Sequence, residues 1–159
     1  MELDTKDRLI LSILQRDVTL GLQTIAQRVG LSPTPCWRRI QKLEQNGVIR
    51  AKVALLDKTQ LNLGVTVFVS IKTSSHSQAW LDRFKQLLSD IPEIIEAHRL
   101  SGNVDYLLQI VVPDIDRYDV IYKKLIEHLD FADISSAFAM ETFKKTTELP
   151  TDYRPQDNR

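Results

Sequence analysis

The sequence predicts an α+β protein of two parts, a helical first third and a mixed second part. Up to Val48, apolar residues recur at the three- and four-residue spacing of amphipathic helices. From residue 65 onward, β-branched and helical stretches follow in the order strand, helix, strand, strand, helix, strand. Charge divides in the same way: residues 1–64 carry ten Lys and Arg against six Asp and Glu, and residues 65–159 carry eleven against fifteen.

A first helix is expected from Asp4 to Gln15. Asp4 is suited to cap its start, and Asp7 follows at the spacing of a capping box, in which side chains and backbone N–H groups bond reciprocally. The apolar side of this helix would pack on the two helices that follow and complete a three-helix core. The residues on that side are Leu9, Ile10, Ile13 and Leu14.

Two more helices are expected between Leu22 and Val48, joined by a tight turn. Gly30 can adopt the left-handed backbone of such a turn, and Ser32 followed by Pro33 is a typical helix start. A short, glycine-led pair of helices is typical of a helix-turn-helix that enters the DNA major groove. It is also found in helical hairpins that bind nothing.

The second helix of this pair carries basic and amide side chains away from its apolar stripe. The stripe includes Cys36, the only cysteine, which is expected to be a packed core thiol rather than a redox sensor. A charged helix face is usually only a solvated face, but residues near the N-terminal half of such a helix reach base edges. The candidate DNA contacts are Ser32, Thr34, Trp37, Arg38, Arg39, Gln41 and Lys42.

Four segments of the chain are expected to differ in role. Residues 1–50 form the helical DNA-binding part, and the alternating run IRAKVALLD suggests a short hairpin or wing within a 51–64 linker. Residues 65–148 form the second domain. Residues 149–159 are a polar tail containing prolines, expected to be loose.

The second domain has the element order of the ferredoxin-like βαββαβ arrangement. With both helices on one face of an antiparallel sheet, the other face needs a cover, and a second subunit is the expected one. The expected strands are 65–73, 94–100, 106–112 and 134–143; the expected helices start at Ser77 and Asp114, and a tight turn spans 101–103.

Catalytic and metal chemistry find little support in the sequence. His76, His98 and His128 lack metal-ligand spacing, and no glycine-rich phosphate loop is present. No enzymatic activity, metal or cofactor is therefore expected. The longest apolar runs, VTVFVSI and LLQIVV, fall short of the roughly 20 residues of a membrane span, and the charged start is unlike a signal peptide, so a cytoplasmic location is expected.

Four blocks resemble the Lrp/AsnC (leucine-responsive, feast/famine) transcriptional regulators. They are LDTKDRLILSILQRD, IAQRVGLSPTPCWRRIQKLEQNGVI, GNVDYLLQIVVPDIDRYD and FAMETFKKTTELP, in the family's order and at its separations. One departure is Gly21, where family members usually have a capping serine. The resemblance implies a winged helix-turn-helix followed by a ferredoxin-like (RAM/ACT-like) domain that senses amino acids and dimerises.

The resemblance also implies an effector pocket, formed by the turn at Gly102 together with the start of the last strand of a neighbouring subunit. A free amino acid needs an anionic acceptor for its ammonium and donors for its carboxylate. Asp105 suits the first role; the Gly102 backbone and two serine hydroxyls suit the second. These residues also fit a plain β-hairpin. The candidates are Gly102, Asn103, Asp105, Tyr106, Ser135 and Ser136.

The sequence thus favours a regulator of transcription that binds duplex DNA and whose assembly or DNA affinity responds to an amino acid. It is expected to be a homodimer, assembling further to a tetramer or octamer, in the cytoplasm with the nucleoid. The rival interpretation is a small-molecule-binding assembly protein whose helical hairpin contacts another protein. A DNA-binding titration distinguishes the two.

Overall fold

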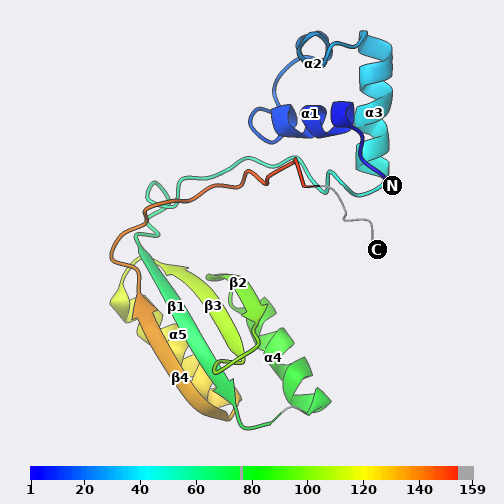
Figure 1. Ribbon diagram of the computed structural model, residues 1–159. Coiled ribbons are helices and arrows are strands. Elements are labelled where there is room, and N and C mark those ends of the chain that lie inside the picture. The colour runs from blue at the N-terminus through cyan, green and yellow to red at the C-terminus, as the bar shows by residue number, and fades with distance from the viewer. Residues whose placement is uncertain (76, 154–159) are drawn as a thin grey trace. The chain divides into compact units, whose positions relative to one another are not determined.

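The computed structural model describes residues 1–75 and 77–153, which form two compact units (Figure 1). The helical unit contains Met1–Leu55 and the chain from Lys144 onward, and the sheet unit contains Leu56–Phe143. The described helices are all too short or too polar to cross a lipid bilayer.

The helical unit contains the three expected helices, α1 (Thr5–Leu14), α2 (Leu22–Val29) and α3 (Pro33–Gln45). They share one apolar core, which confirms the predicted stripes. Cys36 is buried, and burial raises the pKa of its thiol above the ordinary value, as for a packed residue. The buried core residues are Ile10, Ile25, Ala26, Val29, Cys36, Ile40 and Leu43.

The helix ends follow the predicted signals closely. The capping box at α1 is present: Asp4 accepts from the N–H of Asp7 at 2.8 Å and its own N–H donates back at 3.2 Å. Gly30 ends α2 with φ of 68°, and Lys6 donates to the carbonyl of Val29, which is left free at that helix end. Ser32 occupies the N-cap position of α3, but within the described chain its hydroxyl makes no capping bond.

An ion-pair cluster joins the start of α1 to the middle of α3, and we call it the Arg39 clamp. Nη1 of Arg39 donates to Asp4 at 2.6 Å and to Asp7 at 2.7 Å. Because Asp7 is 5% exposed, its charge depends on this partner rather than on water. The N–H of Asp7, and next the Arg39 guanidinium, hold the pKa of the Asp4 carboxyl below its ordinary value of 3.8.

Two expectations for the helical unit are wrong. Residues 50–57, all described, form neither strand nor helix, so the expected hairpin or wing is absent from this stretch. Lys52 instead pairs with Glu44 of α3 at 2.6 Å. The tail, expected to be loose over residues 149–159, is bonded through its backbone by Arg8 and Gln15 as far as Tyr153, and residues 154–159 lie outside the described residues.

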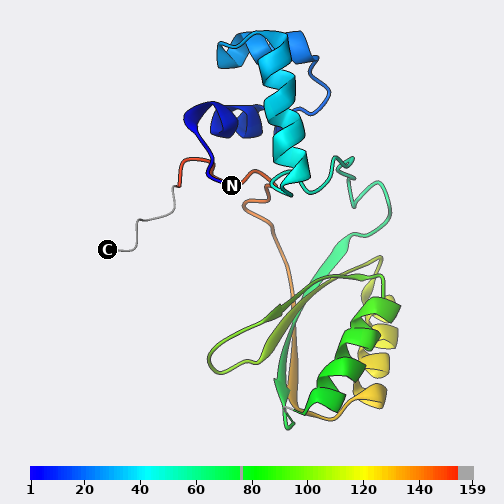
Figure 2. The same cartoon turned by 90° about the vertical axis from the view of Figure 1, so that its right-hand side faces the viewer.

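The sheet unit has the predicted order of elements. Its four strands form one antiparallel sheet in the order β2-β3-β1-β4, and α4 and α5 lie on one face (Figure 2). The elements are β1 (Val65–Thr73), α4 (Gln78–Asp90), β2 (Ile94–Arg99), β3 (Tyr106–Val112), α5 (Ile115–His128) and β4 (Phe131–Phe138).

The last strand differs from the expected range of residues 134–143. It begins at Phe131, which pairs with Thr73 at the end of β1, and it ends at Phe138, which pairs with Val67. Only two residues of β1 precede Val67. The partner strand therefore ends, and with it the ladder that could have extended β4 further.

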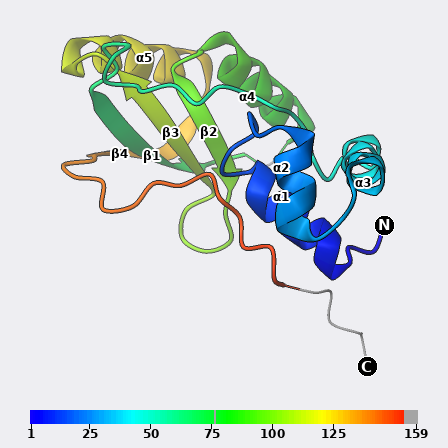
Figure 3. The same ribbon diagram turned by 90° about the horizontal axis from the view of Figure 1, so that it is seen from above.

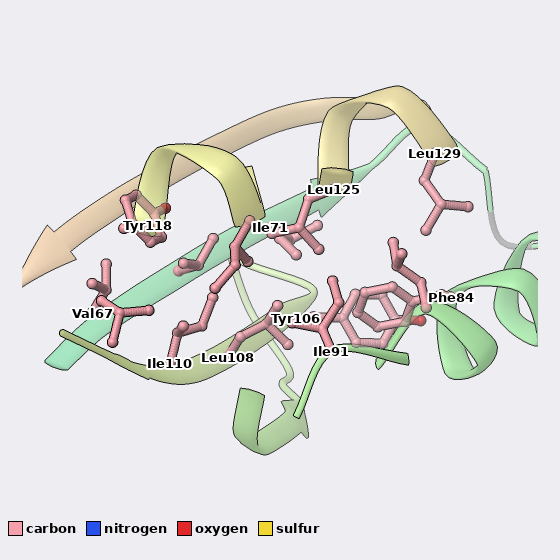
Figure 4. Close-up of a cluster of buried hydrophobic side chains, with 14 of the residues drawn as sticks. Val67, Ile71, Phe84, Ile91, Tyr106, Leu108, Ile110, Tyr118, Leu125 and Leu129 are labelled. Atoms are coloured by element: carbon pink, nitrogen blue, oxygen red, sulfur yellow. The ribbon is translucent and has the colours of Figure 1, made fainter. Parts of the chain in front are cut away.

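The core of the sheet unit lies between the sheet and the two helices (Figure 4). Val67, Val69 and Ile71 alternate along β1 and are fully buried against this core, as the period of a strand requires. Phe68 between them is 37% exposed on the opposite, open face, where it pairs with Gln109 and Ala137. The cover expected over that face would therefore meet an apolar side chain at its centre.

The Arg39 clamp makes the stability of the helical unit depend on pH. Asn caps helices as well as Asp, so Asp4→Asn removes the charge and keeps the cap. Asp4 is half-exposed, so the cost at pH 7 should stay below about 1 kcal/mol. Because the folded pKa is depressed, this contribution is present above pH 3.8 and disappears as the pH falls through the lower folded value.

Urea titrations of the two proteins, followed by circular dichroism between pH 7 and pH 2, check this expectation. Asp4→Ala is the control, since it also removes the cap acceptor and should cost about 1 kcal/mol more. A difference between wild type and Asp4→Asn that does not change with pH would show that the charge of Asp4 contributes nothing.

Candidate functional site

The outward side of α3 presents a continuous polar and aromatic stripe. Thr34, Trp37, Arg38 and Gln41 stand at positions i, i+3, i+4 and i+7, which share one face of a helix. The buried residues of α3 lie on the other side. The Trp37 ring is 51% exposed, a large apolar surface left unburied among polar neighbours. Such a stripe offers both hydrogen-bond donors and an apolar group to base edges.

The remaining candidates on α3 flank this stripe. Ser32 and Lys42 are exposed, so both are free to approach a phosphate. The Gln41 amide donates to Glu44 at 3.2 Å, which holds that side chain along the helix surface. The positive charge of the exposed Lys42 suits a phosphate contact.

Arg39 differs from the other candidates because both of its contacts are internal. Its side chain is one-third exposed and is engaged by Asp4 and Asp7 in the Arg39 clamp. A phosphate would have to compete with two carboxylates for it. The predicted DNA contact of Arg39 stays a prediction, whereas its attachment of α3 to α1 is a direct geometric observation.

The turn between β2 and β3 contains Gly102 and brings Asp105 to the end of β1. Gly102 has φ of 122°, a backbone conformation that favours glycine. The Asp105 carboxylate accepts from the N–H of Thr73 at 2.8 Å, and its own N–H donates to Ile71 at 2.9 Å. Asp105 thus fixes the turn onto β1, and Oδ2 already has a partner there. Asn103 beside it is exposed.

Tyr106 is a core residue. It is 9% exposed, and its ring centroid lies 5.6 Å from that of Trp80 and 4.8 Å from that of Phe84. Its ring therefore points away from the open face. Tyr106 could therefore contribute to ligand binding only through its backbone or by supporting the turn.

Ser135 and Ser136 lie on opposite faces of β4. Ser136 pairs with the inward Val69, and its hydroxyl bonds that of Tyr118 on α5. Burial raises the pKa of the Tyr118 phenol, which favours the neutral, hydrogen-bonded phenol. Ser135 pairs with Ser70 and is exposed on the open face. Within one subunit the two hydroxyls cannot bind the same carboxylate, because successive strand residues point to opposite faces of the sheet.

A hollow that the sequence did not reveal lies where α5 ends and β4 begins. Its volume is about 460 Å³, within the range of small-molecule sites. It has two carboxylates, Asp130 and Asp133, and no signal beyond these acids marks it in the sequence. The predicted effector residues do not line it. Its walls are Tyr122, Ile126, Leu129, Asp130, Phe131, Ala132, Asp133 and Ile134.

Metal chemistry gains no geometric support. Across residues 1–75 and 77–153, no three His, Cys, Asp or Glu side chains gather as a metal site would require. His98 lies on β2 and pairs with Glu96 at 3.1 Å, and His128 bonds a carbonyl of its own helix. His76 lies outside the described residues.

A three-helix unit with a polar outward stripe on its third helix, joined to a ferredoxin-like unit, defines a DNA-binding regulator with a ligand-binding domain. Residues 3–50 match the winged helix-turn-helix DNA-binding family, and residues 66–149 match the Lrp/AsnC ligand binding domain. The chain belongs to the Lrp/AsnC family of transcriptional regulators, as the sequence blocks predicted.

Individual relatives cover nearly the whole chain. The glutamate uptake regulatory protein of Zymomonas mobilis is 46% identical over 149 residues, 94% of this chain and 91% of that protein. An AsnC family transcriptional regulator from Agrobacterium tumefaciens is 59% identical with a TM-score of 0.90, covering 95% and 99% of the two chains. A Neisseria meningitidis transcriptional regulator, solved as its L-Met complex, is 32% identical with a TM-score of 0.88, covering 94% and 97%.

Proposed function

We propose that this regulator reads duplex DNA with the outward stripe of α3 and responds to a free amino acid bound by its sheet unit. The observation that carries the DNA half is the exposure of Trp37 and Arg38 on the face opposite the buried stripe. Such a protein works in the cytoplasm, with the nucleoid, where its DNA is.

Within this proposal the residues of α3 have separate tasks. Arg38 and Gln41 carry hydrogen-bond donors suited to base edges, and Trp37 offers an apolar face suited to a thymine methyl. Lys42, with Ser32 and the helix start, supports through phosphate contacts that carry no sequence information. Thr34 lies in the first turn of α3, and the N-terminal part of a recognition helix is the part that contacts base edges. Arg39 is assigned to positioning, because its guanidinium holds α3 against α1.

The chemistry of the effector is supported by relatives and by the turn. The Neisseria protein was solved with L-Met, and the Zymomonas protein is named for glutamate uptake. In this chain Asp105 offers a carboxylate for an ammonium group, Gly102 a backbone N–H, and Ser135 an exposed hydroxyl. Because Ser136 faces the helices, it supports β4 from behind rather than touching the ligand in this proposal.

A second copy of the chain is the proposed cover of the open sheet face. Phe68 lies at its centre between Gln109 and Ala137, and its exposure in a single chain leaves apolar area for a partner. A homodimer presents two copies of α3, which suits pseudo-palindromic DNA sites. Further association to a tetramer or octamer would bring Ser135 of one copy near the turn of another.

The first prediction separates base reading from phosphate contact. Arg38→Ala should cost about 1–3 kcal/mol on a cognate site if Arg38 reads a guanine edge. Lys42→Ala should weaken all duplexes alike and reduce the salt slope by about one. Fluorescence anisotropy at several salt concentrations measures both, with Arg83→Ala on α4 as control. Unchanged specific affinity in an Arg38→Ala/Gln41→Ala double variant would refute the assignment of α3.

The second prediction concerns the charge of Asp105. Asp105→Asn keeps an acceptor for the N–H of Thr73 while removing the negative charge. It should weaken binding of the amino acid by about tenfold to a hundredfold, the contribution of one charge-assisted hydrogen bond. The affinity for DNA without ligand should stay unchanged. Calorimetric screening of the twenty amino acids identifies the ligand to titrate. If Asp133→Asn lowers the affinity and Asp105→Asn does not, the ligand binds in the hollow beside α5.

The third prediction concerns assembly. Phe68→Glu places a charge at the centre of the open sheet face, where a partner would have to desolvate it. Light scattering should then report a dimer for the wild type and a monomer for Phe68→Glu. Ile115→Glu on α5 is the matched control, since Ile115 is 63% exposed on another surface. A wild-type protein that is monomeric at micromolar concentration would contradict the proposed dimer.

A further inference from the structure

The outer side of α1 holds the end of the described chain. Nη1 of Arg8 donates to the carbonyls of Thr151 at 2.6 Å and Tyr153 at 2.8 Å. The amide of Gln15 bonds Leu149 in both directions, donating to its carbonyl at 2.9 Å and accepting from its N–H at 2.8 Å. Figure 3 shows this segment beside α1, in orange to red.

These contacts are of a kind that recognises extended peptide. Arg8 and Gln15 both bond backbone atoms of the tail. Gln15 donates to and accepts from the same residue, as a neighbouring β-strand would. A further ion pair, Arg16 with Glu148 at 2.9 Å, adds a side-chain contact, although both groups are substantially exposed and contribute little. Arg8 and Gln15 therefore mainly determine which tail residues lie against α1.

A groove surrounds this attachment. Its volume is about 1130 Å³, and its walls come from α1, from the stretch after α3 and from the tail itself. Leu11 and Leu14 of α1 form the apolar floor, and Leu149 and Tyr153 of the tail line the same groove. The groove belongs wholly to the helical unit. One of its walls is therefore a segment that follows the last strand of the other unit in sequence.

The chain consequently connects the two units twice. Residues 56–64 lead from the helical unit into β1, and residues 139–147 lead from β4 back to α1. Each connection has nine residues and can span at most about 30 Å. The second connection leads from β4, the last strand of the sheet unit, to the segment that is bonded to α1.

We propose that the outer side of α1 is a docking surface for residues 148–153 of the same chain, and that Arg8 and Gln15 are positioning residues. Docking joins α1 to β4, the strand that carries Ser135. A rearrangement of β4 on effector binding is then transmitted to the DNA-reading unit through the tail. This transmission rests on the proposed function, whereas the docking itself does not.

Hydrogen exchange tests the docking without DNA or effector. In the wild type, the amide of Leu149 should exchange at least about tenfold more slowly than in the free peptide, because it is bonded to Gln15. An Arg8→Met/Gln15→Met double variant keeps side-chain length and should lose that protection, while α4 and α5 exchange as before. Arg83→Met/Gln86→Met on α4 is the matched control. Equal exchange of Leu149 in the wild type and the free peptide would overturn the docking.

DNA titrations with and without the amino acid test the transmission. Wild-type coupling is expected in the usual range of about 5- to 150-fold. It should fall below about twofold in the double variant, and also in a chain that ends at Thr147, which keeps every residue of α1. A full effector response in variants whose tail is released would overturn the transmission. An effector that leaves wild-type DNA affinity unchanged would overturn the proposed function and leave the exchange result to judge the docking.

Discussion

Successive side chains of a strand point to opposite faces of the sheet, and this alternation in β1 determines what each part of the sheet unit can do. β1 lies between β3 and β4, so its inward residues Val67, Val69 and Ile71 hold the core together. Its outward residues set the composition of the open face. The same rule assigns Ser136 to Tyr118 and leaves Ser135 for contacts outside the subunit. Core packing is therefore assigned to the inward residues of the strands, and the subunit interface and ligand contacts to the outward ones.

In the helical unit, α3 serves three purposes on three of its sides. One side is buried, one carries Arg39 toward α1, and the third presents Trp37 and Arg38 to solvent. Asp7 connects the first two purposes, because it closes the capping box of α1 and also accepts from Arg39. A buried carboxylate of α1 therefore bonds the residue that directly follows Arg38 of the stripe.

Local signals were sufficient to predict most elements of this chain. The capping box of Asp4 and Asp7, the left-handed Gly30 and the alternating strand at residues 65–73 depend on near neighbours, so their outcomes agree with expectation. Contacts between distant residues were not predictable in this way: Asp4 and Arg39 are 35 positions apart, and Gln15 and Leu149 are 134 apart. The opposite directions of Ser135 and Ser136 could have been foreseen from strand periodicity alone. The hollow beside α5 could not, since it arises from how a helix end meets a strand.

The tail on α1 has a consequence for how the protein is made. Chains emerge from the ribosome N-terminus first and domains commonly fold in that order. Here the helices of the first unit are synthesised early, but the segment that docks on α1 appears only after the whole sheet unit. The DNA-reading unit therefore reaches its complete form only after the sensing unit has been translated. A prematurely terminated chain would carry α3 without the tail, so biosynthesis itself distinguishes an unfinished regulator from a finished one.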